Sequence, residues 1–313
     1  MRRQVLLWLP VDRILVMPFV RREASVWRLR SRELGLGDRT LVMGILNITP
    51  DSFSGDGLLA DQENAVARGL AMLDDGAGAL DIGGESTRPG KREPVSAAEE
   101  IERVLPVIRG ILAERPDAIL SIDTYKAATA RAAVAAGAEI VNDVSGFLWD
   151  GEMAGACAEL ACGVVLMHTR GRPEEWGALP RLSAGEVVAV VRSELRERLE
   201  IALAAGVERE RIVLDPGLGF GKAYESNYPL LAGLGELRAL GRPLLSGVSR
   251  KSFLGRTLAS LRGGVDAGVD ERGNATIAAV TASILAGAEA VRVHEVRPAA
   301  EAAAIADAVL AAS

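Results

Sequence analysis

Residues 41–82 read LVMGILNITPDSFSGDGLLADQENAVARGLAMLDDGAGALDI, and this stretch predicts one complete strand–helix–strand unit. Its almost uninterrupted apolar runs at 41–46 and 79–82 are typical of parallel strands that are buried on both faces. The Ala- and Leu-rich segment between them, 61–75, has the length of a helix and ends at a turn, 76–78, that contains two glycines. Parallel strands joined by a helix predict an α/β fold.

The same alternation continues to the end of the chain. Short apolar runs predict eight strands, at 41–46, 79–82, 118–122, 139–142, 163–167, 211–214, 243–247 and 289–293. Helical stretches between them include 61–75, 97–113, 125–136, 186–205, 225–239 and 271–286. Eight such units predict a closed (β/α)8 barrel of the TIM type, with an open doubly wound sheet as the alternative.

The chain therefore divides into two predicted parts. Residues 39–313 form the barrel, and residues 1–38 form an N-terminal extension that precedes the first barrel strand. Because this extension contains Trp8 and Trp27, part of it is expected to form a short hairpin that closes the bottom of the barrel.

Composition limits the classes of partner. Hydrophobic residues make up 49% of the 313 residues, and the net charge is −6, so there is no general reason to bind nucleic acid or an anionic membrane. No uncharged apolar run reaches the ~18 residues of a membrane span. The two cysteines, Cys157 and Cys162, are expected to be buried thiols, which suits a cytoplasmic protein.

Polar residues stand where several of the predicted strands end, and in a barrel these positions meet at the C-terminal face. Asp123, Asn142 and Asp215 each stop an apolar run. Buried carboxylates and amides at one barrel mouth are costly unless a ligand binds them, and a heterocycle rich in N–H donors would satisfy them. The alternative is that each side chain only caps the helix that follows.

Basic residues follow the last two strands, where such barrels commonly hold phosphate. Ser249 and Lys251 come after the seventh strand. Arg292 and His294 straddle the end of the eighth and point to the same side, because side chains alternate along a strand. They are expected to bind a phosphoryl group. The other histidine, His168, could equally be a ligand or a structural residue.

Two glycine-flanked loops also reach this face. Residues 83–90 (GGESTRPG) carry Arg88, which is either an anion ligand on a closing loop or a helix cap. Asn47 could complete the oxygen shell of a Mg2+ ion whose other ligands are water and phosphate, or it could simply form a turn. Phe53 could be a hydrophobic anchor or a lid over a flat substrate.

These motifs, taken in order over about 250 residues, resemble the successive signatures of the dihydropteroate synthases. The matching phrases are Gly44-Ile-Leu-Asn-Ile-Thr-Pro-Asp-Ser-Phe-Ser54, Asp81 to Gly90, Ile122-Asp-Thr124, Asn142-Asp-Val144, Leu166-Met-His168, Leu214 to Lys222, Ser249-Arg-Lys-Ser252 and Arg292-Val-His-Glu-Val296. The chain departs from the family at Ser54-Gly55-Asp56-Gly57, where the family reads Ser-Asp-Gly-Gly, so the position of Asp56 is shifted by one.

The resemblance implies a transferase of folate biosynthesis that joins a dihydropterin diphosphate to p-aminobenzoate, with Mg2+ as cofactor and a homodimer as the assembly. The residues that would contact the dihydropterin diphosphate are Thr87, Arg88, Asp123, Asn142, Asp215, Lys251, Arg292 and His294. Those around p-aminobenzoate would be Phe53, Pro89 and Ser249, and Asn47 would bind the metal. In this family the carbon–oxygen bond to diphosphate breaks first, and the neutral aromatic amine then attacks the pterin cation.

Three other functions are compatible with parts of the pattern. A pterin-binding methyltransferase module of the same barrel type would have no need of diphosphate ligands such as Arg292. A Schiff-base aldolase would use Lys251 as its nucleophile. A non-catalytic pterin-binding paralogue would keep the pocket and lack the activity.

Overall fold

Eight short parallel strands form one sheet in the computed structural model, which describes residues 19–48, 58–85 and 95–313. The strands are β3 (Leu41–Asn47), β4 (Ala79–Gly83), β5 (Leu120–Asp123), β6 (Ile140–Asp143), β7 (Gly163–Met167), β8 (Ile212–Asp215), β9 (Leu245–Ser246) and β10 (Ala290–Val293). Their order is β8-β7-β6-β5-β4-β3-β10-β9. The first and last barrel strands, β3 and β10, pair in parallel, and every other strand lies beside its neighbour in the sequence.

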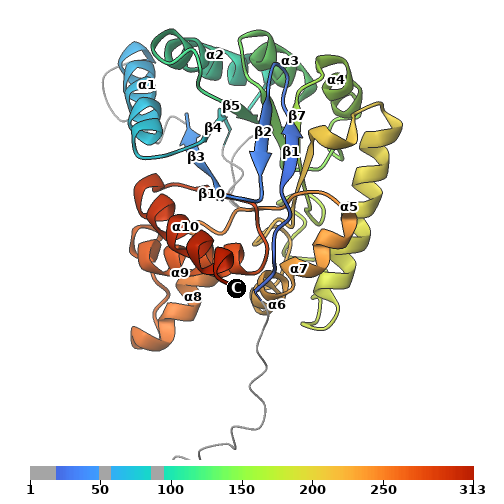
Figure 1. The fold of residues 1–313 in the computed structure, drawn as a ribbon, viewed down its shortest axis with the longest axis vertical. Helices are drawn as coiled ribbons and strands as arrows, with labels where there is room; N and C mark the ends of the chain where they lie inside the picture. The colour runs from blue at the N-terminus through green and yellow to red at the C-terminus, as the bar shows by residue number, and fades with distance from the viewer. Residues whose placement is uncertain (1–18, 49–57, 86–94) are drawn as a thin grey trace, which may run out of the picture.

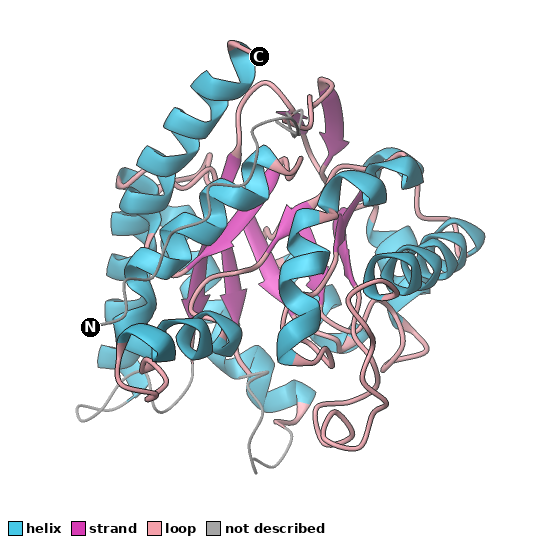
Figure 2. Cartoon of the chain, turned by 90° about the horizontal axis from the view of Figure 1, so that it is seen from below, coloured by secondary structure: helices cyan, strands magenta, loops and turns pink. Residues whose placement is uncertain are grey.

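The two ends of this sheet meet. Leu214 of β8 forms a parallel bridge with Leu244, which precedes β9, and the Leu214 N–H donates to the Pro243 carbonyl over 2.9 Å. The sheet is therefore a nearly closed barrel, as the sequence predicts, and the open doubly wound alternative is wrong. Figure 2 shows the strands in the middle of the molecule with helices around them.

The helices that connect the strands cover the outside of the barrel (Figure 1). They are α1 (Leu58–Asp74), α2 (Ala97–Glu114), α3 (Ala127–Ala135), α4 (Met153–Leu160), α5 (Val187–Ala204), α8 (Ser252–Leu258), α9 (Gly273–Leu285) and α10 (Val296–Ala311). Their buried apolar side chains pack on the outward-facing side chains of the strands in one large core. This arrangement leaves the loops after the strands free to build a site.

The single helix predicted over 225–239 is wrong. This region contains η3 (Tyr224–Ser226), α6 (Asn227–Ala232), α7 (Leu234–Leu237) and η4 (Arg238–Leu240). Gly233 separates α6 from α7, and glycine is a weak helix former. A Cβ atom at Gly233 would lie 2.6 Å from Cγ2 of Val188 on α5, so close packing between these segments requires glycine at the break.

The predicted hairpin is confirmed. It consists of β1 (Ser25–Arg28) and β2 (Glu33–Leu36), which pair antiparallel and lie across the strands in Figure 1. Trp27 is fully buried in a second apolar cluster, which includes the first residues of three barrel strands, Leu41, Ile140 and Ala290. Its indole N–H donates to the Arg211 carbonyl over 2.7 Å. Trp8 lies outside the described residues, and the boundary at 38/39 stays a prediction.

Two further expectations concern the whole chain. Cys157 and Cys162 are free, buried thiols, as predicted. Within the described ranges, no helix is both long enough and apolar enough to cross a membrane.

Candidate active site

A cavity of about 430 Å³ lies at the C-terminal ends of the barrel strands. Eight of the residues that the sequence singles out line it: Asn47, Asp123, Asn142, Asp215, Ser249, Lys251, Arg292 and His294. They come from six different strands or the loops just after them. Phe53, Thr87, Arg88 and Pro89 lie outside the described residues, so their predicted roles are untested.

A buried ion-pair network forms one wall of the cavity. Arg292 on β10 donates from Nε to Oδ2 of Asp81 over 2.5 Å and from Nη2 to Oδ2 of Asp123 over 2.6 Å. Asn142 donates from Nδ2 to the same oxygen of Asp81 over 2.8 Å. Strands that are far apart in the sequence are thereby joined through side chains at the barrel mouth.

Asp81 is the member of this network that the site prediction did not include. It is fully buried in the middle of β4, where it stands as a charged residue inside an otherwise apolar strand and opens one of the phrases that carry the family resemblance. Its partner Arg292 lies 211 positions away, so the sequence does not show that the two meet.

The same network leaves acceptor oxygens unused. Oδ1 of Asp81 and Oδ1 of Asp123 are buried and have no hydrogen-bond partner among the described residues. Burial raises the pKa of Asp123 to about 7, against the opposing effect of Arg292 and with help from the neighbouring Asp81, Glu100 and Asp143 carboxylates. A ligand that donates N–H bonds would stabilise the ionised form of Asp123.

Asp215 ends β8 on the other side of the cavity. Its Oδ1 accepts a hydrogen bond from the Gly217 N–H over 2.7 Å. Burial raises its pKa, although the Gly217 bond and the nearby Lys251 and Lys222 ammonium groups oppose the effect. Asp215 is thus a second buried acceptor with cations close by.

The glycine-rich segment after β8 sets the geometry around Asp215. Gly217 has a φ of 63°, and a Cβ atom there would lie 1.9 Å from the His168 carbonyl oxygen, so only glycine fits. Lys222 closes the turn, because its ammonium donates to the carbonyls of His168, Gly217 and Phe220 over 3.3, 2.7 and 3.1 Å. Lys222 is therefore bound to the backbone of its own loop.

Cationic and hydroxyl groups from the loop after β9 and from the end of β10 also line the cavity. The Lys251 Nζ lies 3.7 Å from the centre of the Phe220 ring, a cation–π contact. His294 Nδ1 lies 2.9 Å from Ser249 Oγ, which also accepts the His294 backbone N–H over 3.2 Å. Arg292 and His294 both line the cavity, as their spacing of two predicts.

Several cavity residues were missed by the sequence reasoning. Trp176 and Phe220 meet edge to face, with ring centres 5.5 Å apart, at the cavity wall. Arg272 also lines the cavity and donates to the Arg250 carbonyl over 2.9 Å. These residues lie on long connections or at a helix start, where no strand end marks them.

Asn47 and His168 have different surroundings. Asn47 ends β3 opposite Gly83, and Asn47 Oδ1 and Asp123 Oδ2 both lie 3.6 Å from the position that a Cβ atom at Gly83 would take, so these two oxygens lie in the same corner of the cavity. His168 does not line the cavity. It is fully buried, its Nε2 lies 2.9 Å from Glu194 Oε2, and burial lowers its pKa to about 3, so the structure favours the structural role.

No group of three or more His, Cys, Asp and Glu residues in the described part of the chain could hold a metal ion.

Comparison with known proteins gives a consistent picture. Residues 43–294 match the family model of pterin binding enzymes. The chain is 42% identical over 288 residues to the dihydropteroate synthase of Bacillus subtilis, covering 92% of this chain and 95% of that protein. It is 47% identical over 260 residues to a probable bifunctional folylpolyglutamate synthase/dihydropteroate synthase of Halobacterium salinarum, covering 83% of this chain but only 30% of that protein.

The fold also resembles those of solved structures of this family. The dihydropteroate synthase of Xanthomonas albilineans, solved with 4-aminobenzoic acid, superimposes with a TM-score of 0.82 and 41% identity. The match covers 92% of this chain and 99% of that one. The similarity therefore extends over the whole barrel.

Proposed function

Because the chain belongs to the pterin-binding enzymes and, within them, to the dihydropteroate synthases, we propose that it condenses 6-hydroxymethyl-7,8-dihydropterin diphosphate with p-aminobenzoate. The products are 7,8-dihydropteroate and pyrophosphate, and the enzyme is a transferase of folate biosynthesis. The observation that carries this proposal is that one cavity is lined both by the buried acceptors Asp123, Asn142 and Asp215 and by the basic side chains of Lys251, Arg292 and His294.

The buried acceptors of the cavity suit the pterin ring. Asp123, Asn142 and Asp215 present carboxylate and amide groups that are at most 7% exposed. The aminopyrimidinone ring of a pterin carries several N–H donors, which can bond to these oxygens, while Asn142 can also donate. Thr87 and Lys251 are proposed to complete this pocket.

The basic side chains of the cavity suit the diphosphate. Among the described residues, the bonds of Arg292 to Asp81 and Asp123 use Nε and Nη2, and we propose that Nη1 binds a phosphoryl oxygen. We place His294 and Arg88 beside it. Asn47 would hold Mg2+, and this ion, when bound, would neutralise charge on the leaving diphosphate.

This arrangement supports a mechanism in two steps. The bond between the pterin methylene carbon and the diphosphate oxygen breaks, and its electron pair leaves with the diphosphate. Ionised Asp123 and Asp215 stabilise the positive charge that develops on the pterin. The amine nitrogen of p-aminobenzoate then attacks the methylene carbon and loses a proton to solvent.

The amine substrate needs a second pocket next to the first. Ser249 lines the cavity beside His294, and Phe53 and Pro89 are proposed to surround the aromatic ring. A homodimer and a cytoplasmic location, both expected from the sequence, complete the proposal.

A coupled assay of pyrophosphate release tests this function. The purified protein is incubated with the dihydropterin diphosphate and Mg2+, with and without p-aminobenzoate. We expect release that depends on p-aminobenzoate. Tight binding of the pterin without turnover would identify a non-catalytic paralogue instead, and methyl transfer from a reduced folate would identify the methyltransferase alternative.

A further inference from the structure

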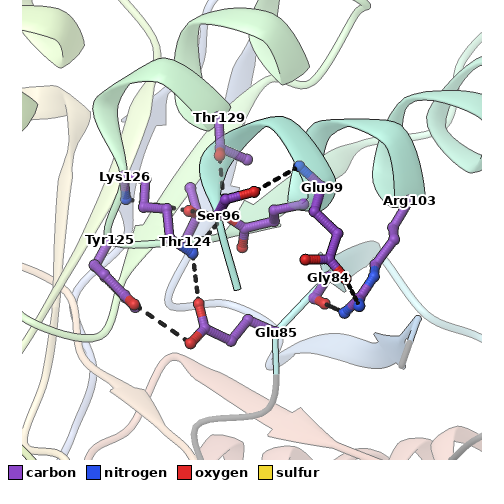
Figure 3. A network of polar contacts seen from close by, with 10 residues as sticks. Gly84, Glu85, Ser96, Glu99, Arg103, Thr124, Tyr125, Lys126 and Thr129 are labelled. Carbon is purple, nitrogen blue, oxygen red and sulfur yellow. Dashed lines mark hydrogen bonds and ion pairs between the residues drawn. The ribbon is translucent and has the colours of Figure 1, made fainter. Parts of the chain in front are cut away.

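A largely buried charge cluster (Figure 3) includes Glu85, which lines the cavity. Its centre is Lys126, just before α3. The Lys126 ammonium contacts Glu85 Oε2 over 2.5 Å and Glu100 Oε2 over 3.0 Å. The side chains of Lys126, Glu85 and Glu100 are only 14%, 16% and 1% exposed. We call these three residues the Lys126 cluster.

Hydroxyl groups fix the deep end of the Lys126 cluster. Glu100 Oε2 also accepts from Thr124 Oγ1 over 3.0 Å and from Thr129 Oγ1 over 2.9 Å. Thr124 directly follows the cavity residue Asp123. The cluster is therefore tied to α2, to α3 and to the end of β5 at once.

The chain that leaves β4 is held at two neighbouring residues, Gly84 and Glu85. Tyr125 donates from its hydroxyl to Glu85 Oε1 over 3.3 Å, in addition to the Lys126 contact. Arg103 on α2 donates to the Gly84 carbonyl over 2.8 Å. Figure 3 shows both contacts converging on the chain as it leaves β4.

Charge is the reason to assign a role to this cluster. Glu85 lines the cavity, as do the carboxylates Asp123 and Asp215. Burial by itself would lower the pKa of Lys126, but the Glu100 and Glu85 carboxylates outweigh it and raise the pKa, so the ammonium stays charged. Lys126 is thus the cation that compensates Glu85 at the cavity wall.

Building on the proposed function, we propose that Lys126 is a positioning residue that neutralises Glu85 and holds it against the cavity wall, so that the cavity accepts a diphosphate anion. Lys126 does not line the cavity among the described residues, so it acts through Glu85. Without Lys126, the cluster keeps two carboxylates and no cation, and their charge repels the substrate across a medium of low dielectric constant.

Steady-state kinetics of single and double variants test this role. Lys126→Met should raise the KM for the dihydropterin diphosphate about tenfold, with a smaller change in kcat, because ground-state binding of the anion is weakened. Adding Glu85→Gln to Lys126→Met removes the unpaired carboxylate that lines the cavity, leaving only Glu100 behind it, and should restore most of the KM. Lys126→Arg keeps the charge and should stay close to wild type.

The matched control is Arg131→Met. Arg131 lies on the same helix, α3, and pairs with Glu159 over 2.5 Å, but both side chains are exposed. This variant removes a cation and an ion pair without touching the cavity, so its KM should not change. An unchanged KM in Lys126→Met, or a double variant that is as impaired as Lys126→Met alone, overturns the proposal.

Binding of pyrophosphate by calorimetry gives a readout without turnover. Lys126→Met should bind it about tenfold more weakly than wild type, and Glu85→Gln at least as tightly. If Lys126→Met does not fold, Glu85→Gln still decides, because weaker binding by that variant contradicts the proposed repulsion. Wild-type protein without synthase activity would refute the proposed function, whereas active wild type with unchanged variants would refute only the role of Lys126.

Discussion

Replacing Asp123 with asparagine should separate the stability of this protein from its activity. Asp123 is 7% exposed, and one carboxylate oxygen has no partner among the described residues. Its pKa is about 7 against an ordinary value of 3.8. Since one pH unit corresponds to about 1.4 kcal/mol, keeping this carboxylate ionised costs the folded protein on the order of 4 kcal/mol.

The raised pKa of Asp123 determines how its contribution to stability changes with pH. The folded protein binds this proton more tightly than the unfolded chain does, so the contribution of Asp123 to stability is complete below about pH 4 and is lost as the pH rises to about 7. The amide side chain in the variant does not titrate. As the pH rises from about 4 to about 8, the free energy of unfolding of Asp123→Asn should therefore rise relative to that of wild type by up to about 4 kcal/mol, in addition to a constant difference from the weakened contact with Arg292.

Urea unfolding followed by circular dichroism over this pH range measures the difference. Activity should change in the opposite direction, because the variant lacks the negative charge that stabilises the pterin cation. The pH profile of wild-type kcat/KM should fall on the acid side with an apparent pKa of about 7. Parallel stability curves for variant and wild type, or no acid limb near pH 7, would refute the reasoning.

Three further predictions concern other parts of the site. Asn47→Ala should raise the Mg2+ concentration needed for half-maximal activity about tenfold, since one oxygen ligand is lost; full activity in a chelator contradicts this. Asp215→Asn should lower kcat about 10²-fold or more, and unchanged turnover would make Asp215 structural. Gly217→Ala should lower the free energy of unfolding by more than about 2 kcal/mol, because its Cβ would lie 1.9 Å from the His168 carbonyl oxygen. Gly151→Ala, with nothing within 4 Å, should change it by less than about 0.5 kcal/mol, and equal effects in urea unfolding would argue against this account.

The barrel could be predicted from the sequence because its strands are buried on both faces and therefore read as apolar runs. The break in the predicted helix 225–239 was missed although Gly233 is visible in the sequence, because the close approach of Val188 from another helix, which favours glycine there, is not. Local patterns define which elements form, whereas the close approach of two helices is set only when the chain folds.

The candidate site shows the same division. Asp123 and Arg292 could be selected because each stands at a strand end, where a barrel collects its functional side chains. Asp81 lies inside a strand, and the Lys126 cluster lies outside the strands. The contacts of both are with partners that are distant in the sequence. Phe53, Thr87, Arg88 and Pro89 stay predictions.

The central claim is that the protein joins a pterin to an aromatic amine in this cavity and releases pyrophosphate. The most direct test quantifies both products from the same reaction, dihydropteroate by mass spectrometry and pyrophosphate by a coupled enzyme assay. We expect equal amounts of the two, and neither in the absence of p-aminobenzoate or in Arg292→Met. Pyrophosphate released without dihydropteroate, or no reaction from folded wild-type protein supplied with Mg2+ and both substrates, would contradict the account.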